Sequence, residues 1–242
     1  MPSEWDIGEF ATLVKTKIGA PHENAMLPAL ESIPEKFRFC HYHYSRALEL
    51  MSPHKKEVKD HFAQTAAAMQ MLFGQSEEER RRFIEALFGA RAHAVAFAQS
   101  LHSTADYLAK VIYRGLDLNG RHSISIPNHQ IGLARVKDRI SAVTELATVK
   151  QKIEDYLSSS SFLYLAAFVN TEKHHEIVDA TFSLSFSVGS VASAGLRMKA
   201  FQYSGGSFSE KWAIDFFEKD FQSILERTAE VGCALNDYLK TI

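Results

Sequence analysis

The chain has 242 residues, of which 46% are hydrophobic and 23% are charged, and 17 of them are Phe. This composition is typical of a globular protein with a sizeable apolar core, and it excludes a chain that is disordered throughout. The 27 basic and 29 acidic side chains give a formal net charge of -2, so no overall positive field attracts nucleic acid. RNA binding would need a local basic patch.

The N-terminal sequence lacks the basic segment and apolar run of a secretory signal. No stretch approaches the roughly 18 uninterrupted apolar residues of a membrane span. Cys40 and Cys233 lie far apart without a partner motif, so we predict neither a disulfide framework nor a cysteine zinc site. We therefore expect a soluble, cytoplasmic protein that does not contact a membrane.

The N-terminal region predicts short helices separated by prolines. Apolar residues recur at helical spacing over 4–18, and proline then interrupts the pattern three times. We expect a short helix, an irregular connector with Pro21, Pro28 and Pro34, an amphipathic helix over 35–51 closed by Ser52-Pro53, and a helix over 54–73.

The clearest helix signal follows. Ser76 and Glu79 match the capping-box pattern, in which the serine accepts from an early helical amide and the glutamate reaches back. From Ile84 to Ile112 apolar residues recur every three or four positions, which predicts one long helix over 76–114, ended by Gly115 and Gly120.

The next segments predict a loop and two more helices. Residues 121–132 contain Pro127 and no sustained period, so we expect a loop, and long loops are often functional. Helical spacing returns over 133–157. The serine run 158–161 breaks it and supplies a cap for a helix over 162–176.

A β-hairpin is predicted before the last helix. Over 180–188 the period changes to two, 189–195 has the small residues of a turn, and 196–203 alternates again. Ser207 and Glu210 offer a second capping box, and a long helix should run over about 210–240. We expect a single domain over 1–242, mainly α, in which an irregular helical bundle carries the hairpin of about 180–203.

Two residues of the long helix are candidates for chemistry. His102 and Asp106 are four residues apart, so their side chains lie one turn apart on the same side. A carboxylate would hold the imidazole in one tautomer and make it more basic, as general-base catalysis and metal ligation both require. The alternative is a core histidine whose ring nitrogen is satisfied by Asp106.

The second candidate group is Asn170-Thr-Glu-Lys173-His174-His175. On a helix, Asn170 and His174 share a stripe with apolar residues, so this amide and imidazole need polar partners. His102 and Asp106 are the partners that we expect. A structural network between helices is the alternative, because buried polar networks also specify how helices pack.

These residues carry a resemblance. The string from Phe168 to His175 at the end of a helix, together with His-Ser-x-x-Asp-x-Leu-Ala in an earlier long helix, resembles the HEPN superfamily over residues 76–178. HEPN proteins are helical bundles that include RNases of bacterial defence and toxin systems. Their motif is an Arg, usually followed by Asn, Asp or His, and then a His after a spacing of four to six residues. Asn170 fits the polar position and His174 the histidine, whereas Val169 stands in place of the Arg.

The resemblance implies that Arg and His act together in RNA cleavage, across a dimer. Lys173 would substitute for the Arg only in part, because an ammonium lacks the bidentate fork of a guanidinium.

Other groups predict no metal site. Cys40, His41 and His43 do not share one helix face, and the charged run over 77–82 is typical of a solvated helix.

Two functions remain open. The first is a non-catalytic HEPN-like module that binds RNA or a partner protein, in which His102, Asp106 and His175 have a binding or structural role. The second is a metal-independent RNase or related phosphodiesterase with His174 as general acid or base, aided by Asn170 and Lys173.

We expect no cofactor. An isolated hairpin is marginal in water and has exposed edges, which with the resemblance predicts a homodimer.

Overall fold

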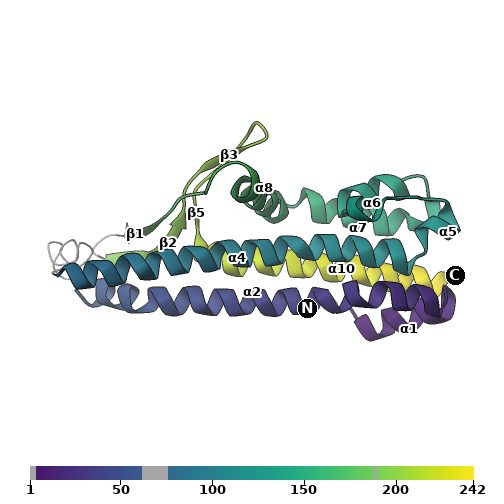
Figure 1. Ribbon diagram of the computed structural model, residues 1–242, viewed down its shortest axis with the longest axis horizontal. Coiled ribbons are helices and arrows are strands. Elements are labelled where there is room, and N and C mark those ends of the chain that lie inside the picture. The colour runs from purple at the N-terminus through teal and green to yellow at the C-terminus, as the bar shows by residue number, and fades with distance from the viewer. Residues whose placement is uncertain (1–3, 62–75, 188–189) are drawn as a thin grey trace. The chain divides into compact units, whose positions relative to one another are not determined.

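The computed structural model describes residues 4–61, 76–187 and 190–242. The protein is mainly α-helical with a small antiparallel sheet before the C-terminal helix, as the sequence predicts (Figure 1). The chain divides into two compact units. Unit 1 comprises Met1–Arg38, Ser100–Ala166 and Asp220–Ile242, and unit 2 comprises Phe39–Gln99 and Ala167–Lys219.

Unit 1 is built from helices. It contains α1 (Ile7–Lys17), α5 (Leu118–His122), η1 (Asn128–Gln130), α6 (Leu133–Ile140), η2 (Thr144–Leu146), α7 (Ala147–Ser158), α10 (Phe221–Thr241) and parts of α2 (Ala20–His61), α4 (Glu77–Gly115) and α8 (Ser160–His174).

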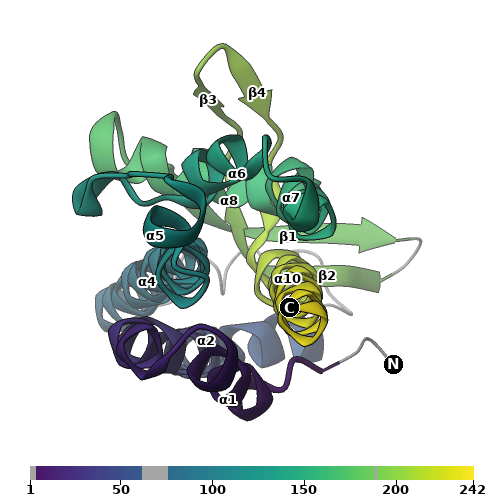
Figure 2. The ribbon, with the colours of Figure 1, turned by 90° about the vertical axis from the view of Figure 1, so that its right-hand side faces the viewer.

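The core of unit 1 lies around α10. This helix packs against α1 and α7 (Figure 2). Ile224, Val231, Leu235 and Leu239 recur at helical spacing on it and are fully buried. Tyr156 of α7 is also fully buried, and its ring lies 5.0 Å from that of Phe162. The predicted amphipathic pattern of the last helix is therefore the pattern that builds this core.

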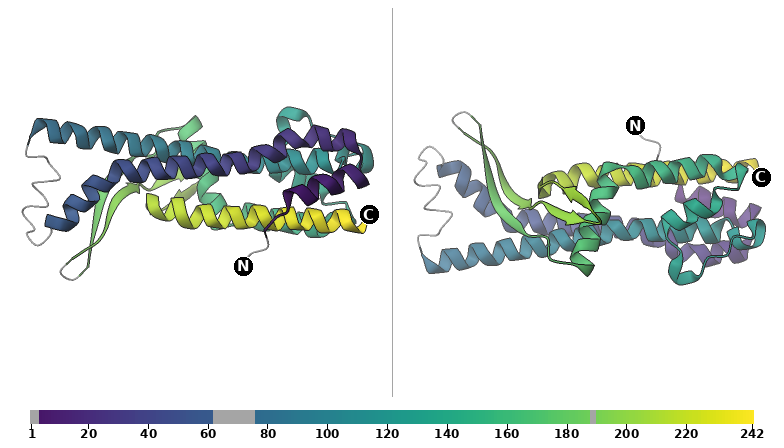
Figure 3. Two further views of the ribbon diagram at one scale, coloured as in Figure 1. Left: turned by 90° about the horizontal axis from the view of Figure 1, so that it is seen from below. Right: turned by 90° about the horizontal axis from the view of Figure 1, so that it is seen from above.

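Unit 2 combines the remaining parts of α2, α4 and α8 with short strands. Its other elements are β1 (Ala180–Ser187), β2 (Ser190–Met198), β3 (Phe201–Tyr203), β4 (Gly206–Phe208), β5 (Lys211–Trp212), α9 (Ala213–Asp215) and most of the π-helical turn Phe216–Asp220. One sheet has the order β1-β2-β5, and β3 pairs with β4 in a second sheet; all pairs are antiparallel (Figure 3).

Phenylalanine rings fill the core of unit 2. The buried ring of Phe97 lies 5.5 Å from Phe216 and 4.8 Å from Phe217. Phe168 lies 5.9 Å from Phe216 and 6.1 Å from Phe201. Edge-to-face and tilted contacts of this kind add to the stabilisation from buried apolar area. Rings from α4, α8, β3 and the π-helical turn therefore meet in one cluster.

The prolines do not interrupt the N-terminal helices as predicted. Instead, α2 runs continuously from Ala20 to His61 through Pro21, Pro28, Pro34 and Pro53. Pro21 occupies the first turn, where its missing N–H has no helical partner in any case. Leu30 and Ile33, which lie between Pro28 and Pro34, are 1% and 2% exposed, and this burial offsets the lost hydrogen bonds. Of the helix expected over 54–73, residues 62–73 lie outside the described residues.

Other boundaries also differ from the prediction. The helix expected over 133–157 is broken by 141–146 into α6 and α7, and the loop expected over 121–132 contains the end of α5 and η1. Residues 190–195, expected in a turn, belong to β2, where Ser183 pairs with Gly195. A separate turn at Ser204 and Gly205 joins β3 to β4. The φ values of these two residues, 48° and 78°, suit a tight hairpin.

The first predicted capping box is present and the second is absent. The backbone N–H of Ser76 donates to Glu79 Oε2 (3.0 Å), and the N–H of Glu79 donates to Ser76 Oγ (3.2 Å). Ser207 instead lies in β4 and exchanges hydrogen bonds with the Gln202 side chain. β5 pairs with β2 at 211–212, so helix begins only at Ala213 and not at 210. Strand pairing overrides the local capping signal here.

The helices in the described parts of the chain lack the combination of length and apolar character that crossing a bilayer requires.

Candidate functional site

The predicted site residues of α8 lie at its C-terminal end, in unit 2. Asn170 is half-buried, whereas Lys173, His174 and His175 are exposed. His175 follows the last helical residue, and its ring meets the Tyr203 ring of β3 edge-on at 5.9 Å. The helix end therefore presents an ammonium and two imidazoles to solvent.

Two residues next to this group are buried. Val169 is 1% exposed, and Thr171 is fully buried. Thr171 Oγ1 has no hydrogen-bond partner within the described part of the chain. Position 169 is thus an apolar core position, and a guanidinium there would need a partner for its buried charge.

The connection from α8 to β1 is fixed by a polar clamp on α4. The backbone N–H of Val178 donates to Glu172 Oε1 (2.7 Å), and Arg91 Nη2 donates to the Val178 carbonyl (2.9 Å). Arg91 Nη1 also lies 3.4 Å from Asp179 Oδ1. Burial raises the pKa of Glu172, while the Val178 N–H and Arg91 oppose that rise. Arg91 is therefore engaged in holding the turn.

The other predicted pair lies in unit 1. His102 is half-buried, and its ring is nearly parallel to that of Phe162, with the centroids 5.8 Å apart and 8° between the planes. Asp106 is exposed. Since Asn170 and His174 belong to unit 2, the expected pairing of the two groups stays a prediction.

A histidine pair in unit 2 was missed by the sequence reasoning. His43 Nδ1 of α2 lies 3.0 Å from His93 Nδ1 of α4, although 50 residues separate them in the chain. Cys40 and His41 go elsewhere, because Cys40 is buried with its Sγ 3.7 Å from the Phe97 carbonyl and His41 is exposed. The sequence Cys-His-Tyr-His marks His43 as a candidate ligand, but nothing in the sequence pairs it with His93.

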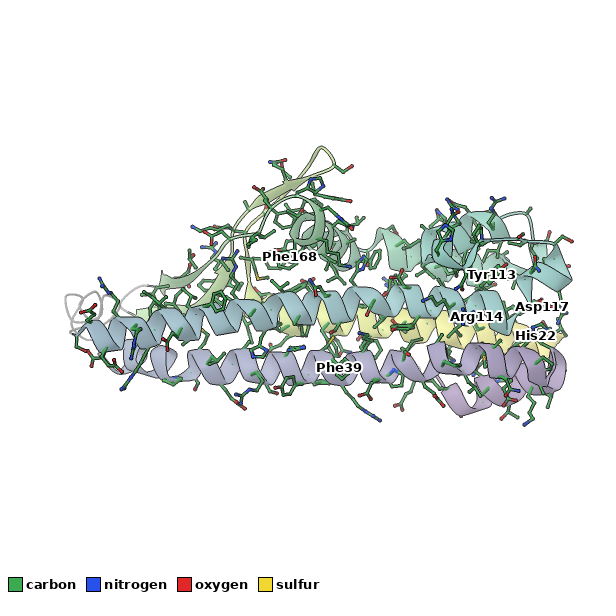
Figure 4. All side chains as sticks on the ribbon, in the orientation of Figure 1. His22, Phe39, Tyr113, Arg114, Asp117 and Phe168 are labelled. Atoms are coloured by element: carbon green, nitrogen blue, oxygen red, sulfur yellow. The ribbon has the colours of Figure 1, made fainter. Side chains whose placement is uncertain are left out.

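A second missed cluster lies in unit 1 at the C-terminal end of α4 (Figure 4). Arg114 donates to Asn128 Oδ1 (2.8 Å) and to the Ala25 carbonyl (3.2 Å). His22 Nε2 lies 3.7 Å from Asp117 Oδ2, and Tyr113 Oη accepts from the N–H of Ile126 (3.1 Å). The cluster fastens the segment after α4 to α2, and the Arg114 fork is occupied by protein acceptors.

The same segment has unusual backbone geometry. Asp117 and Ser123 adopt left-handed φ values of 44° and 54°, which cost energy for residues other than glycine. Asp117 Oδ1 accepts from the N–H of Gly120 (3.0 Å), which holds the turn locally. Nε2 of His122 is buried and has no hydrogen-bond partner within the described ranges. The long loop expected over 121–132 thus coincides with a strained, anchored segment.

Comparisons with known proteins identify no relative of this chain. The sequence matches no protein-family model, no curated protein and no solved structure. Over residues 4–61, 76–187 and 190–242, three or more His, Cys, Asp or Glu side chains do not converge as a metal site would require.

Proposed function

We propose that this chain is a non-catalytic, HEPN-like module that binds RNA or a partner protein through the exposed end of α8. The observation that carries the proposal is the contrast between Val169, which is 1% exposed, and the exposed group Lys173, His174 and His175. A core residue, Val169, stands where the HEPN motif has its arginine, while the hydrogen-bonding side chains at 173–175 remain accessible. Binding requires the accessible group but not the missing cation.

The charges around the helix end are mixed. Lys173 and Lys199 are exposed, and so are Glu176 and Asp179. A surface of this kind attracts phosphate groups less strongly than a basic patch does, so any contact with RNA would depend on hydrogen bonds and ring stacking as well as on charge. His175 and Tyr203 supply rings for such stacking.

A homodimer in the cytoplasm is part of the proposal. Among the described strands, β1 pairs on one edge with β2 and forms the other edge of its sheet, where a second copy could add a strand. Light scattering at micromolar concentration tests the dimer, and a sharply monomeric species would contradict it.

Binding and cleavage of fluorescein-labelled RNA, without added metal, test the proposed function. We compare the wild type with Lys173→Ala/His174→Ala/His175→Ala and with the matched control Lys15→Ala/His41→Ala/His129→Ala, which removes the same groups from exposed positions elsewhere. We expect no cleavage by any protein, and binding that is weakened in the α8 variant only. Binding that is equal in all three would remove the end of α8 from the contact surface.

The RNase alternative rests on the accessibility of His174, which a substrate phosphate could reach. If it holds, the wild type cleaves RNA, His174→Ala abolishes cleavage, and both proteins melt at the same temperature. That outcome would overturn the non-catalytic function. If the wild type is folded but neither binds nor cleaves RNA, a partner protein becomes the ligand to seek.

A further inference from the structure

Unit 1 contains a cavity of about 470 Å³ that no proposed function uses. It lies between the segment before α1, the N-terminal part of α2 and the first half of α10. Its apolar walls include Trp5, Ile33, Phe37 and Leu225. Pockets that bind small molecules in proteins usually have volumes of about 300 to 1,000 Å³ and mainly apolar walls.

The walls are held in place by contacts with the core of unit 1. The Trp5 side chain is 8% exposed, and its Nε1 donates to Asn236 Oδ1 (3.4 Å). Gly232 of α10 makes room for the indole, because a Cβ at this position would overlap it. On the other side, the Phe37 ring packs edge-on against Phe221 at 5.7 Å. The cavity is therefore preformed and not a gap between loose side chains.

The charged side chains that line the cavity, among the described residues, are both acidic. Glu4 and Glu226 line it, and Lys, Arg and His are absent from the described residues that do so. Glu226 Oε1 accepts from Gln222 Nε2 (2.9 Å), which orients that carboxylate. Two carboxylates beside an apolar cavity favour a positively charged group and disfavour an anion.

We infer that this cavity binds a small amphipathic cation, with an apolar body among Trp5, Phe37 and Leu225 and an ammonium group near Glu4 and Glu226. Burial of the apolar body supplies most of the affinity, and the carboxylates select the charge of the head group. The inference rests on unit 1 alone and does not depend on the end of α8.

Matched ligands separate the two parts of the inference. Decylamine, decanol and decanoate share one alkyl chain and differ in the charge of the head group. Binding is followed by Trp5 fluorescence in a Trp212→Phe background, because Trp212 lies in unit 2 and would add a second signal. We expect decylamine to bind best, decanol more weakly, and decanoate roughly tenfold more weakly than decylamine or not at all.

Variants test where the ligands bind. Leu225→Phe and, separately, Ala229→Leu fill the cavity without adding a second tryptophan, and both should abolish binding of decylamine and decanol. Glu4→Gln/Glu226→Gln should remove the preference for the amine and retain decanol, whereas Glu154→Gln, at an exposed position of α7, should change nothing. Circular dichroism checks that each variant folds. Binding that survives in both filled variants, equal binding of all three ligands to the wild type, or no binding at all would overturn the inference.

Discussion

His43 Nδ1 lies 3.0 Å from His93 Nδ1 and links α2 to α4 within unit 2. The Tyr42 ring makes edge-on contacts with both imidazoles, with its centroid 5.3 Å from that of His43 and 6.2 Å from that of His93. At this contact one Nδ1 must donate and the other accept, so a single proton lies between them. When both rings are protonated, both nitrogens are donors and the two charges repel, and the link is lost.

The histidine pair predicts a loss of stability in acid. Burial, and secondarily the His93 charge, lower the pKa of His43 below its ordinary value of 6.5. At pH values between 6.5 and the lowered pKa of His43, the unfolded chain binds more protons than the folded chain. The free energy of unfolding therefore falls as the pH falls through this range. Urea denaturation at intervals from about pH 7.5 to 5 measures this slope.

A variant isolates the contribution of the pair. His43→Gln should show a smaller decrease over that pH range than the wild type, whereas His129→Gln, which removes an exposed histidine, should retain the full decrease. Parallel curves for the wild type and His43→Gln would show that the pair does not cause the acid sensitivity.

Arg91 should stabilise unit 2 through its contacts with Val178 and Asp179. Arg91→Met keeps most of the side-chain length but leaves the Val178 carbonyl without this donor, which should cost about 1 to 2 kcal/mol in unfolding free energy. It should also raise the pKa of Glu172 further, because Arg91 opposes the effect of burial on that carboxyl. Chemical denaturation measures the loss.

Arg81→Met is the matched control, since Arg81 is an exposed residue paired with Glu78 on the same helix. Exposed pairs of this kind contribute little, so its effect should be close to zero. Similar losses in the two variants would argue against the clamp at the start of β1.

Gly232→Ala should destabilise the protein, although the same change usually stabilises a helix interior by about 1 kcal/mol. The added Cβ would overlap the Trp5 indole and force it from its site, at a cost of about 1 to 3 kcal/mol. Trp5 fluorescence in a Trp212→Phe background, together with thermal unfolding, measures both effects.

A double-mutant cycle gives the decisive comparison. In a Trp5→Ala background the obstacle to the added Cβ is gone, so Gly232→Ala should become neutral or stabilising. If the substitution destabilises both backgrounds equally, the close approach of Trp5 is not the reason for the glycine.

The capping box at the start of α4 predicts a local effect. Ser76→Ala removes the acceptor of the Glu79 N–H and should destabilise the first turn by about 1 kcal/mol. Hydrogen exchange of the amides in the first turns of α4 should accelerate. Ser158→Ala, a change at an exposed serine of α7, should leave those amides unchanged. Unchanged exchange in Ser76→Ala would mean that other contacts hold the helix start.

The sequence predicted the elements whose signals are local. The Ser76 and Glu79 side chains bond within one turn, and the alternation after Ala180 reports a strand directly. Prediction failed where distant residues decide. Nothing near Ser207 reveals that residues 211–212 pair with β2, and Pro28 and Pro34 predict a break unless the burial of the flanking residues is known.

The same division holds for the candidate sites. The sequence by itself determined the fold class, the long helix over 76–114, the hairpin and the polar group at the end of α8, because periodicity, capping and strand alternation act over a few residues. Only the tertiary structure decided that His43 meets His93, that Val169 is buried whereas His174 is exposed, and that Trp5, Phe37 and Leu225 line a cavity with two carboxylates. These relationships depend on which helix faces meet, and that choice is set by packing between residues far apart in the chain.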